Sequence, residues 1–212
     1  MRISDDRYDR DLRRYNLARR MIQHEARTTT IALWTGLTKY RIQTLFRSYR
    51  HGGNHRRHRG AAPSQPALFS RSLTLECEAA ALAYIGLQME IIPPMVVPDA
   101  QHSLPGLARG EKLVTAFELY RTLVPQSRVS LEHAVLLMTE LAHRRTLLLE
   151  QCEACDGLMV VDRLAVRKST CAFCRLDRQG APMASKGSRA SEDPVFESSS
   201  SVYSGNKNSI SA

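Results

Sequence analysis

The sequence has no run of about 20 apolar residues, the length that a helix needs to cross a lipid bilayer. Its longest apolar stretches, at 79–92 and 129–149, contain charged residues or end at proline. The first six residues also lack the apolar core of a signal peptide. We therefore expect a cytoplasmic protein with no membrane partner.

Recognisable motifs of catalysis are missing as well. The sequence has no Gly-rich phosphate-binding loop, no H-x-E metal motif and no plausible nucleophile–base pair. His133 and His143 are ten positions apart, which is too far for adjacent turns of one helix. The sequence therefore predicts a protein that is not an enzyme and has no small-molecule substrate.

Cysteine is scarce, but four of the five cysteines form a pattern, Cys152-x2-Cys155 and Cys171-x2-Cys174, with fifteen residues between the pairs. Two such knuckles can direct four thiolates at one tetrahedral centre, for which zinc is the favoured metal. Four cysteine ligands leave no open coordination position, so we expect one structural Zn²⁺ per chain. Two disulfides or an iron–sulfur cluster are the alternatives. Cys77, the fifth, is predicted to be a buried apolar residue.

The residues around these cysteines suggest a zinc-ribbon-like module. Gly157 follows the first knuckle, where a turn often needs a positive φ angle. The apolar segment 158–161 and the segment 163–168 are predicted to form a short β-hairpin between the two knuckles.

Positive charge is concentrated at the start of the chain. The net charge is +9, yet residues 1–59 contain 15 Lys and Arg against 5 Asp and Glu, a net charge of +10, and the remainder is close to neutral. An excess confined to one segment is typical of a nucleic-acid contact surface. The basic, glycine-broken stretch His51 to Arg59 is predicted to be a loop that adds phosphate contacts.

The same segment has the spacing of a helix-turn-helix. Counting from Thr28, Ala32 is the fifth residue, Gly36 the ninth and Ile42 the fifteenth. These positions require a small residue where two helices cross, a glycine in the tight turn and a branched residue between the helices. Thr38 can cap the second helix. The predicted DNA-binding residues, at the start and on the outward face of that helix, are Thr38, Lys39, Tyr40, Gln43, Thr44 and Arg47.

Apolar periodicity predicts further helices at 7–25, 70–92, 112–123 and 129–151, the last leading directly into Cys152. The fold class is therefore mainly α, a helix-turn-helix-containing helical body with a small C-terminal four-cysteine module. The predicted parts are a basic segment with the helix-turn-helix at 1–59, a helical body at 60–150, the zinc module at 151–178 and a disordered Ser-rich tail at 179–212.

The order of these parts resembles the FlhC family, the C subunit of the bacterial flagellar master transcriptional regulator. Three segments carry the resemblance: Gly36-Leu-Thr through Arg41-Ile-x-x-Leu-Phe46, Ala116-Phe-Glu-Leu-Tyr-Arg121, and the four-cysteine pattern. Together they cover most of residues 10–178. The resemblance implies a DNA-binding activator subunit that assembles with a D-type partner subunit into a hetero-oligomer. It also implies binding to promoter DNA upstream of flagellar operons, recruitment of RNA polymerase, and zinc bound by Cys152, Cys155, Cys171 and Cys174.

An RNA-binding or ribosome-associated zinc-ribbon protein is the alternative, because basic segments and four-cysteine ribbons are frequent there too. Aromatic residues, on which RNA modules stack bases, make up only 6% of the chain, which favours DNA. The crowding of leucines between 136 and 149 predicts a helix that is apolar on more than one face, which must be fully buried or must meet another chain. We expect the other chain to be the partner subunit.

Overall fold

A computed structural model of the chain describes residues 5–50, 61–94, 105–164, 166 and 169–180. The predicted basic loop at 51–59 and the tail from 181 onward lie outside these residues. All the described residues belong to one compact unit that extends to Gly180.

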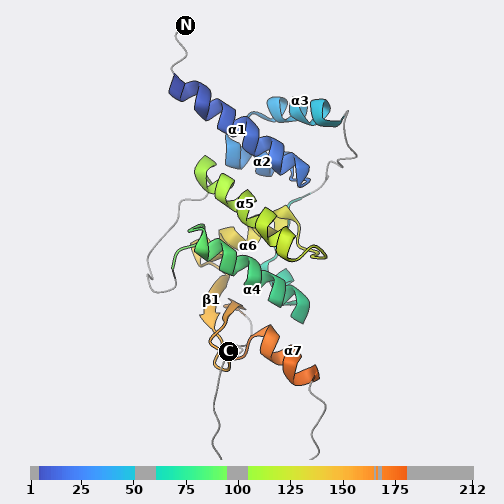
Figure 1. The fold of residues 1–212 in the computed structure, drawn as a ribbon, viewed down its shortest axis with the longest axis vertical. Coiled ribbons are helices and arrows are strands. Elements are labelled where there is room, and N and C mark those ends of the chain that lie inside the picture. The colour runs from blue at the N-terminus through green and yellow to red at the C-terminus, as the bar shows by residue number, and fades with distance from the viewer. Residues whose placement is uncertain (1–4, 51–60, 95–104, 165, 167–168, 181–212) are drawn as a thin grey trace, which may run out of the picture. The chain divides into compact units, whose positions relative to one another are not determined.

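The described chain is mainly helical, as predicted, with one small sheet (Figure 1). None of its helices is long and apolar enough to cross a membrane. The elements in chain order are α1 Asp5–Gln23, α2 Thr28–Thr35, α3 Lys39–Arg50, the 3₁₀ helix η1 Pro66–Ser70, α4 Leu73–Gln88, α5 Leu107–Leu123, α6 Leu131–His143, β1 Leu147–Gln151, β2 Leu158–Asp162 and α7 Ala172–Gly180.

The core is built around α5, which packs against α1 and α2 at one side and against α4 and α6 at the other. Figure 1 shows α5 between α1 and α4. Helices α1 to α6 each contribute buried apolar side chains to this core, and side chains three and four positions apart share one helix face. The largest fully buried side chains are Leu17, Met21, Ile22, Ile31, Ile42, Phe69, Leu82, Ile91, Ile92, Leu113, Tyr120 and Leu131.

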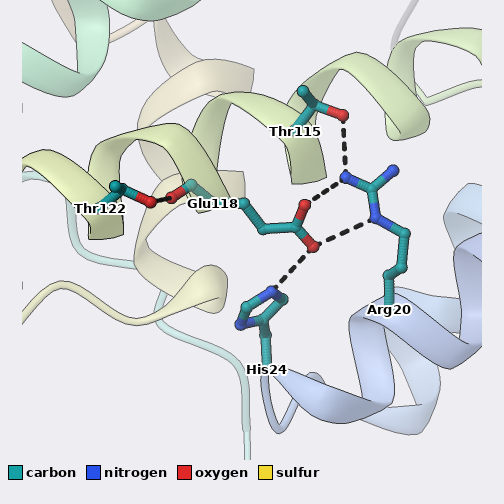
Figure 2. A network of polar contacts seen from close by, with 5 residues as sticks. All are labelled: Arg20, His24, Thr115, Glu118 and Thr122. Carbon is teal, nitrogen blue, oxygen red and sulfur yellow. Dashed lines mark hydrogen bonds and ion pairs between the residues drawn. The ribbon is translucent and has the colours of Figure 1, made fainter.

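A polar network joins α1 to α5 at the edge of this core (Figure 2). The Arg20 guanidinium donates two hydrogen bonds to Glu118, at 3.1 and 2.6 Å, and a third to the Thr115 hydroxyl at 2.8 Å. Nε2 of His24 lies 3.1 Å from the same carboxylate. Burial alone would raise the pKa of Glu118, but the hydrogen bonds and charges of Arg20 and His24 outweigh it and lower that pKa. Part of the basic charge of α1 is therefore used inside the protein.

The two helices α2 and α3 are joined by a tight connection. Gly36 ends α2 in the left-handed conformation, with φ +70°, and its N–H donates to the Ala32 carbonyl at 2.9 Å. Thr38 caps α3, because its hydroxyl accepts from the Arg41 N–H at 3.4 Å. Ile42 is fully buried. Gly36 therefore forms the turn, Thr38 accepts a capping hydrogen bond and Ile42 is buried, as the sequence predicted for each residue.

The predicted helix at 129–151 is wrong at its C-terminal end. Helix α6 stops at His143, where Arg144 takes the left-handed conformation with φ 50°. Residues 147–151 instead form strand β1, which pairs antiparallel with β2 from Leu147↔Asp162 to Gln151↔Leu158. The cysteine module is therefore attached through a strand and not through a helix end.

This change also removes the predicted apolar excess between 136 and 149. Leu137, Met138, Leu141 and Leu147 are buried in the chain's own core, and Leu136 and Leu149 pack against it. Because residues 136–149 are divided between helix α6 and strand β1, these leucines pack into the same core. These residues therefore do not form an exposed apolar face.

We expect Gly110→Ala to destabilise the protein, because a β-carbon there would lie 2.8 Å from Cδ2 of Leu17 and 3.2 Å from Cε3 of Trp34. Both neighbours are buried, so the strain of about 1–3 kcal/mol exceeds the helix-propensity gain of up to about 1 kcal/mol. Gly106→Ser is the control, since no atom lies within 4 Å of its β-carbon position. Equal denaturant midpoints for the two variants would contradict this close packing.

A second prediction concerns pH. In the capping box of α6 the Ser130 N–H donates to Nδ1 of His133 at 3.2 Å, which requires an unprotonated nitrogen. Burial lowers the pKa of His133, and the charge of Glu132 opposes this shift only partly. The unfolded chain therefore binds more protons between the lowered folded pKa and the unfolded value of about 6.5. Stability should fall as the pH falls through this interval.

The matched control is His133→Gln, which keeps a capping-box acceptor that does not titrate. We expect the wild type to lose more stability than the variant between pH 7.5 and pH 5.5, as measured by urea unfolding. Equal losses of stability in the two proteins would rule out His133 as the source of this pH dependence.

Candidate metal centre and nucleic-acid interface

The four predicted cysteines converge on one point. Their sulfur atoms all lie within 4.8 Å of one another, with 3.9 Å between Cys152 and Cys174 and 3.7 Å between Cys155 and Cys171. A tetrahedral shell with metal–sulfur bonds of about 2.3 Å has sulfur–sulfur distances of about 3.8 Å. These separations are far longer than a disulfide bond of about 2.05 Å, and the cysteines are free. The donor set thus fits one metal ion.

Each pair of cysteines is held by a different local structure. Cys152 and Cys155 lie in the connection between β1 and β2, where the Cys152 N–H donates to the Gly157 carbonyl at 2.9 Å. Cys171 directly precedes α7, and Cys174 lies in its first turn. Sheet and helix therefore present the two pairs to a common centre.

Two details of the module differ from the prediction. Strand β2 pairs with β1, which precedes the first knuckle. Of the predicted second strand at 163–168, Arg163 and Leu164 form a turn, and residues 165, 167 and 168 lie outside the described residues. The residue with the left-handed φ angle is Asp156, at 56°, and not Gly157. A β-carbon at position 157 would lie 3.1 Å from the sulfur of Cys155, a tight contact, so Gly157 leaves space for that sulfur.

Backbone N–H groups point at the sulfurs. The Cys171 and Ala154 N–H groups donate to the sulfur of Cys152, at 3.2 and 3.4 Å, and the Cys174 N–H donates to that of Cys171 at 3.4 Å. The bond from Cys171 is the main reason that the pKa of Cys152 falls to about 6. The neighbouring thiols Cys155 and Cys171 raise the pKa of Cys174 to about 12. Four thiolates this close can be charged together only around a cation.

The cysteine module, which consists of β1, β2 and α7, is packed onto the helical body. Helix α4 contacts both β2 and α7, and α6 contacts β1. An ion pair between Glu76 of α4 and Arg175 of α7 links the two parts, and both side chains are largely buried. This pair joins residues 99 positions apart, so sequence spacing gave no sign of it.

The predicted DNA-binding residues lie together on α3 and at its N-terminus. Thr38, Lys39, Tyr40, Thr44 and Arg47 are exposed, whereas Gln43 is half-buried. The aromatic side chain of Tyr40 is 73% exposed. Within the described part of the chain, neither Lys39 nor Arg47 makes an ion pair.

The basic side chains of α1 are arranged differently. Arg13 pairs with Glu111, Arg14 with Asp11 and Arg20 with Glu118. Arg19 lies over the ring of Tyr49, 5.5 Å from its centroid, and so braces α3 against α1. Several basic side chains of α1 therefore make contacts within the protein. Near the turn at Gly36, the positive charges without an ion pair among the described residues include those of Lys39 and Arg47 on α3.

Comparison with protein-family models and with curated proteins gave no match for this sequence.

Proposed function

We propose that this chain is a DNA-binding transcriptional activator subunit of the FlhC type. It uses α2 and α3 as a helix-turn-helix, holds a structural zinc ion, and works with a D-type partner subunit. The complex binds promoter DNA upstream of flagellar operons and recruits RNA polymerase.

The observation that carries this proposal is the exposed face of α3. Its outward positions, Tyr40, Gln43, Thr44 and Arg47, follow the three- and four-residue spacing of one helix face. Arg and Gln can form paired hydrogen bonds with base edges, and Thr can contact a thymine methyl group or a phosphate. The opposite face is anchored by Ile42. A helix held from behind, with a polar and basic front, suits insertion into a major groove.

The proposed zinc ion is held by Cys152, Cys155, Cys171 and Cys174. Zinc is the preferred metal because it favours tetrahedral thiolate shells and has no redox chemistry. A fully cysteine-ligated ion supplies a crosslink and no open position for a substrate. It ties β1, β2 and α7 together in a module too small to bury a large core of its own.

An apolar groove beside the module supports a role for a partner subunit. It has a volume of about 520 Å³ and lies between α4, α5 and the start of α7. Tyr84, Leu123 and Phe173 line it and are each more than half exposed. A groove lined by exposed apolar side chains can accept apolar side chains of a partner chain.

The proposal is tested by selecting duplexes from a random DNA pool with the full zinc-loaded chain, alone and with the candidate partner. Arg47→Ala should then reduce discrimination between selected and scrambled duplexes by about 1–3 kcal/mol, the value of a bidentate base contact. Arg178→Ala, which removes the same charge from an exposed position on α7, should leave discrimination unchanged.

Failure to enrich any duplex would contradict the proposal. Preferential binding of a single-stranded or hairpin RNA pool in the same assay would favour the RNA-binding alternative. Identical behaviour of the two arginine variants would show that α3 does not read bases.

A further inference from the structure

Glu132 is a buried carboxylate whose oxygens are hydrogen-bonded to the N-terminal end of a different helix, α2. It lies in the first turn of α6 and is only 7% exposed. Buried carboxylates are costly unless hydrogen bonds satisfy their oxygens. Here both oxygens are satisfied by α2: Oε1 accepts from the Arg27 N–H at 2.7 Å, and Oε2 accepts from the Thr30 hydroxyl at 2.8 Å.

Helix α2 needs this carboxylate because it has no N-terminal cap of its own. Its N-cap residue is Arg27, whose side chain makes no capping hydrogen bond, and its first turn contains no acidic residue. Unsatisfied N–H groups and the positive end of the helix dipole both favour a negative oxygen at this position. Glu132, more than 100 residues away in the sequence, supplies it.

The two hydrogen bonds constrain α2 in a way that its apolar contacts do not. Packing of α2 on α1 and α5 is non-directional, so it tolerates small rotations and shifts. Two charge-assisted bonds to specified oxygens fix the N-terminal end of the helix. At the C-terminal end of α2, the tight turn at Gly36 and the packing of the buried Ile42 fix α3 relative to α2.

We propose that Glu132 is a positioning residue for DNA recognition: it locks α2 to the helical body and thereby sets the angle at which α3 meets the groove. The inference rests on the proposed function. It assigns specificity to a residue that contacts no DNA, because small misplacements of a recognition helix weaken directed base contacts more than phosphate contacts.

The test uses the full zinc-loaded chain and a duplex selected from a random pool by the wild type, with a scrambled duplex for comparison. Glu132→Ala should lower the ratio of the two affinities about tenfold, consistent with the loss of charge-assisted hydrogen bonds. The salt dependence of binding to the scrambled duplex should not change, because no phosphate contact is removed. Glu140→Gln is the matched control: its carboxylate lies on the same helix but accepts from the nearby Thr146 N–H at 3.3 Å.

Thr30→Val provides a second, milder test. It removes one donor to Glu132 while keeping the shape of a buried side chain, so it should lower the ratio in the same direction by less. Variants that lose thermal stability yet keep the wild-type ratio would overturn the inference and leave Glu132 with a purely structural role. If the wild type selects no duplex, or if Arg47→Ala keeps the ratio, the proposed function fails instead.

Discussion

Replacing Cys152 or Cys174 with serine should abolish metal binding and unfold the module formed by β1, β2 and α7. The four sulfurs lie within 4.8 Å of one another and together can fill one tetrahedral shell, so removing one leaves that shell incomplete. The binding energy of a structural metal is folding energy, and loss of such a site destabilises by more than about 4 kcal/mol. Because α4 and α6 pack on the module, part of this loss should spread to the helical body.

Cys77→Ser is the control for this experiment. Cys77 lies on α4, is half-buried and does not belong to the four-sulfur cluster. We expect one zinc per chain in the wild type and in Cys77→Ser, and less than a tenth of that in Cys152→Ser, as measured by elemental analysis after gel filtration. A metal-free Cys152→Ser chain with an unchanged urea midpoint would refute a structural role for the site.

Ile42→Ala should be the most damaging substitution on α3. The side chain is fully buried where α3 meets α1 and α2, so its truncation leaves a cavity in addition to the lost burial. Such changes cost about 2–5 kcal/mol. Sequence-specific DNA binding should weaken as well, because α3 loses the contact that holds it against α2.

Arg41, the exposed residue next to Ile42, provides the control substitution. Arg41→Ala should change the free energy of unfolding by no more than about 0.5 kcal/mol, as usual for a surface position. Urea unfolding of both variants, with zinc content checked to be equal, measures the difference. Similar midpoints for the two would show that Ile42 does not anchor α3.

The parts of this fold that sequence reasoning predicted are those governed by short-range patterns. The turn at Gly36 needs one residue with a positive φ angle, and the glycine is visible in the sequence. The cysteine cluster likewise follows from spacing, because two knuckles at this separation can direct four thiolates at one centre.

The errors lie where distant pairing overrides local preference. Leu147 to Gln151 would suit a helix, and neither glycine nor proline marks its boundary with α6. The break occurs at Arg144, which adopts the left-handed conformation without being a glycine. Pairing with β2 decides the outcome, and that partner lies beyond the first knuckle.

The contacts that fix one helix against another were also hidden. Glu132 meets Arg27 across 105 residues, and Arg20 meets Glu118 across 98. In the sequence, Arg20, Glu118 and Glu132 appeared only as charged residues within predicted helices. Such pairs depend on how the helices are placed against one another, and the apolar periodicity of a sequence does not determine this placement.

Photo-crosslinking from α3 tests the central claim most directly. A benzophenone amino acid is placed at Thr44, on the exposed face of α3, or at Tyr84, an exposed position on α4, in the full zinc-loaded chain with its selected duplex. We expect a crosslink to DNA from position 44 and none from position 84. Crosslinks from position 84 alone, or none from either position on a duplex that is demonstrably bound, would contradict DNA recognition by α3.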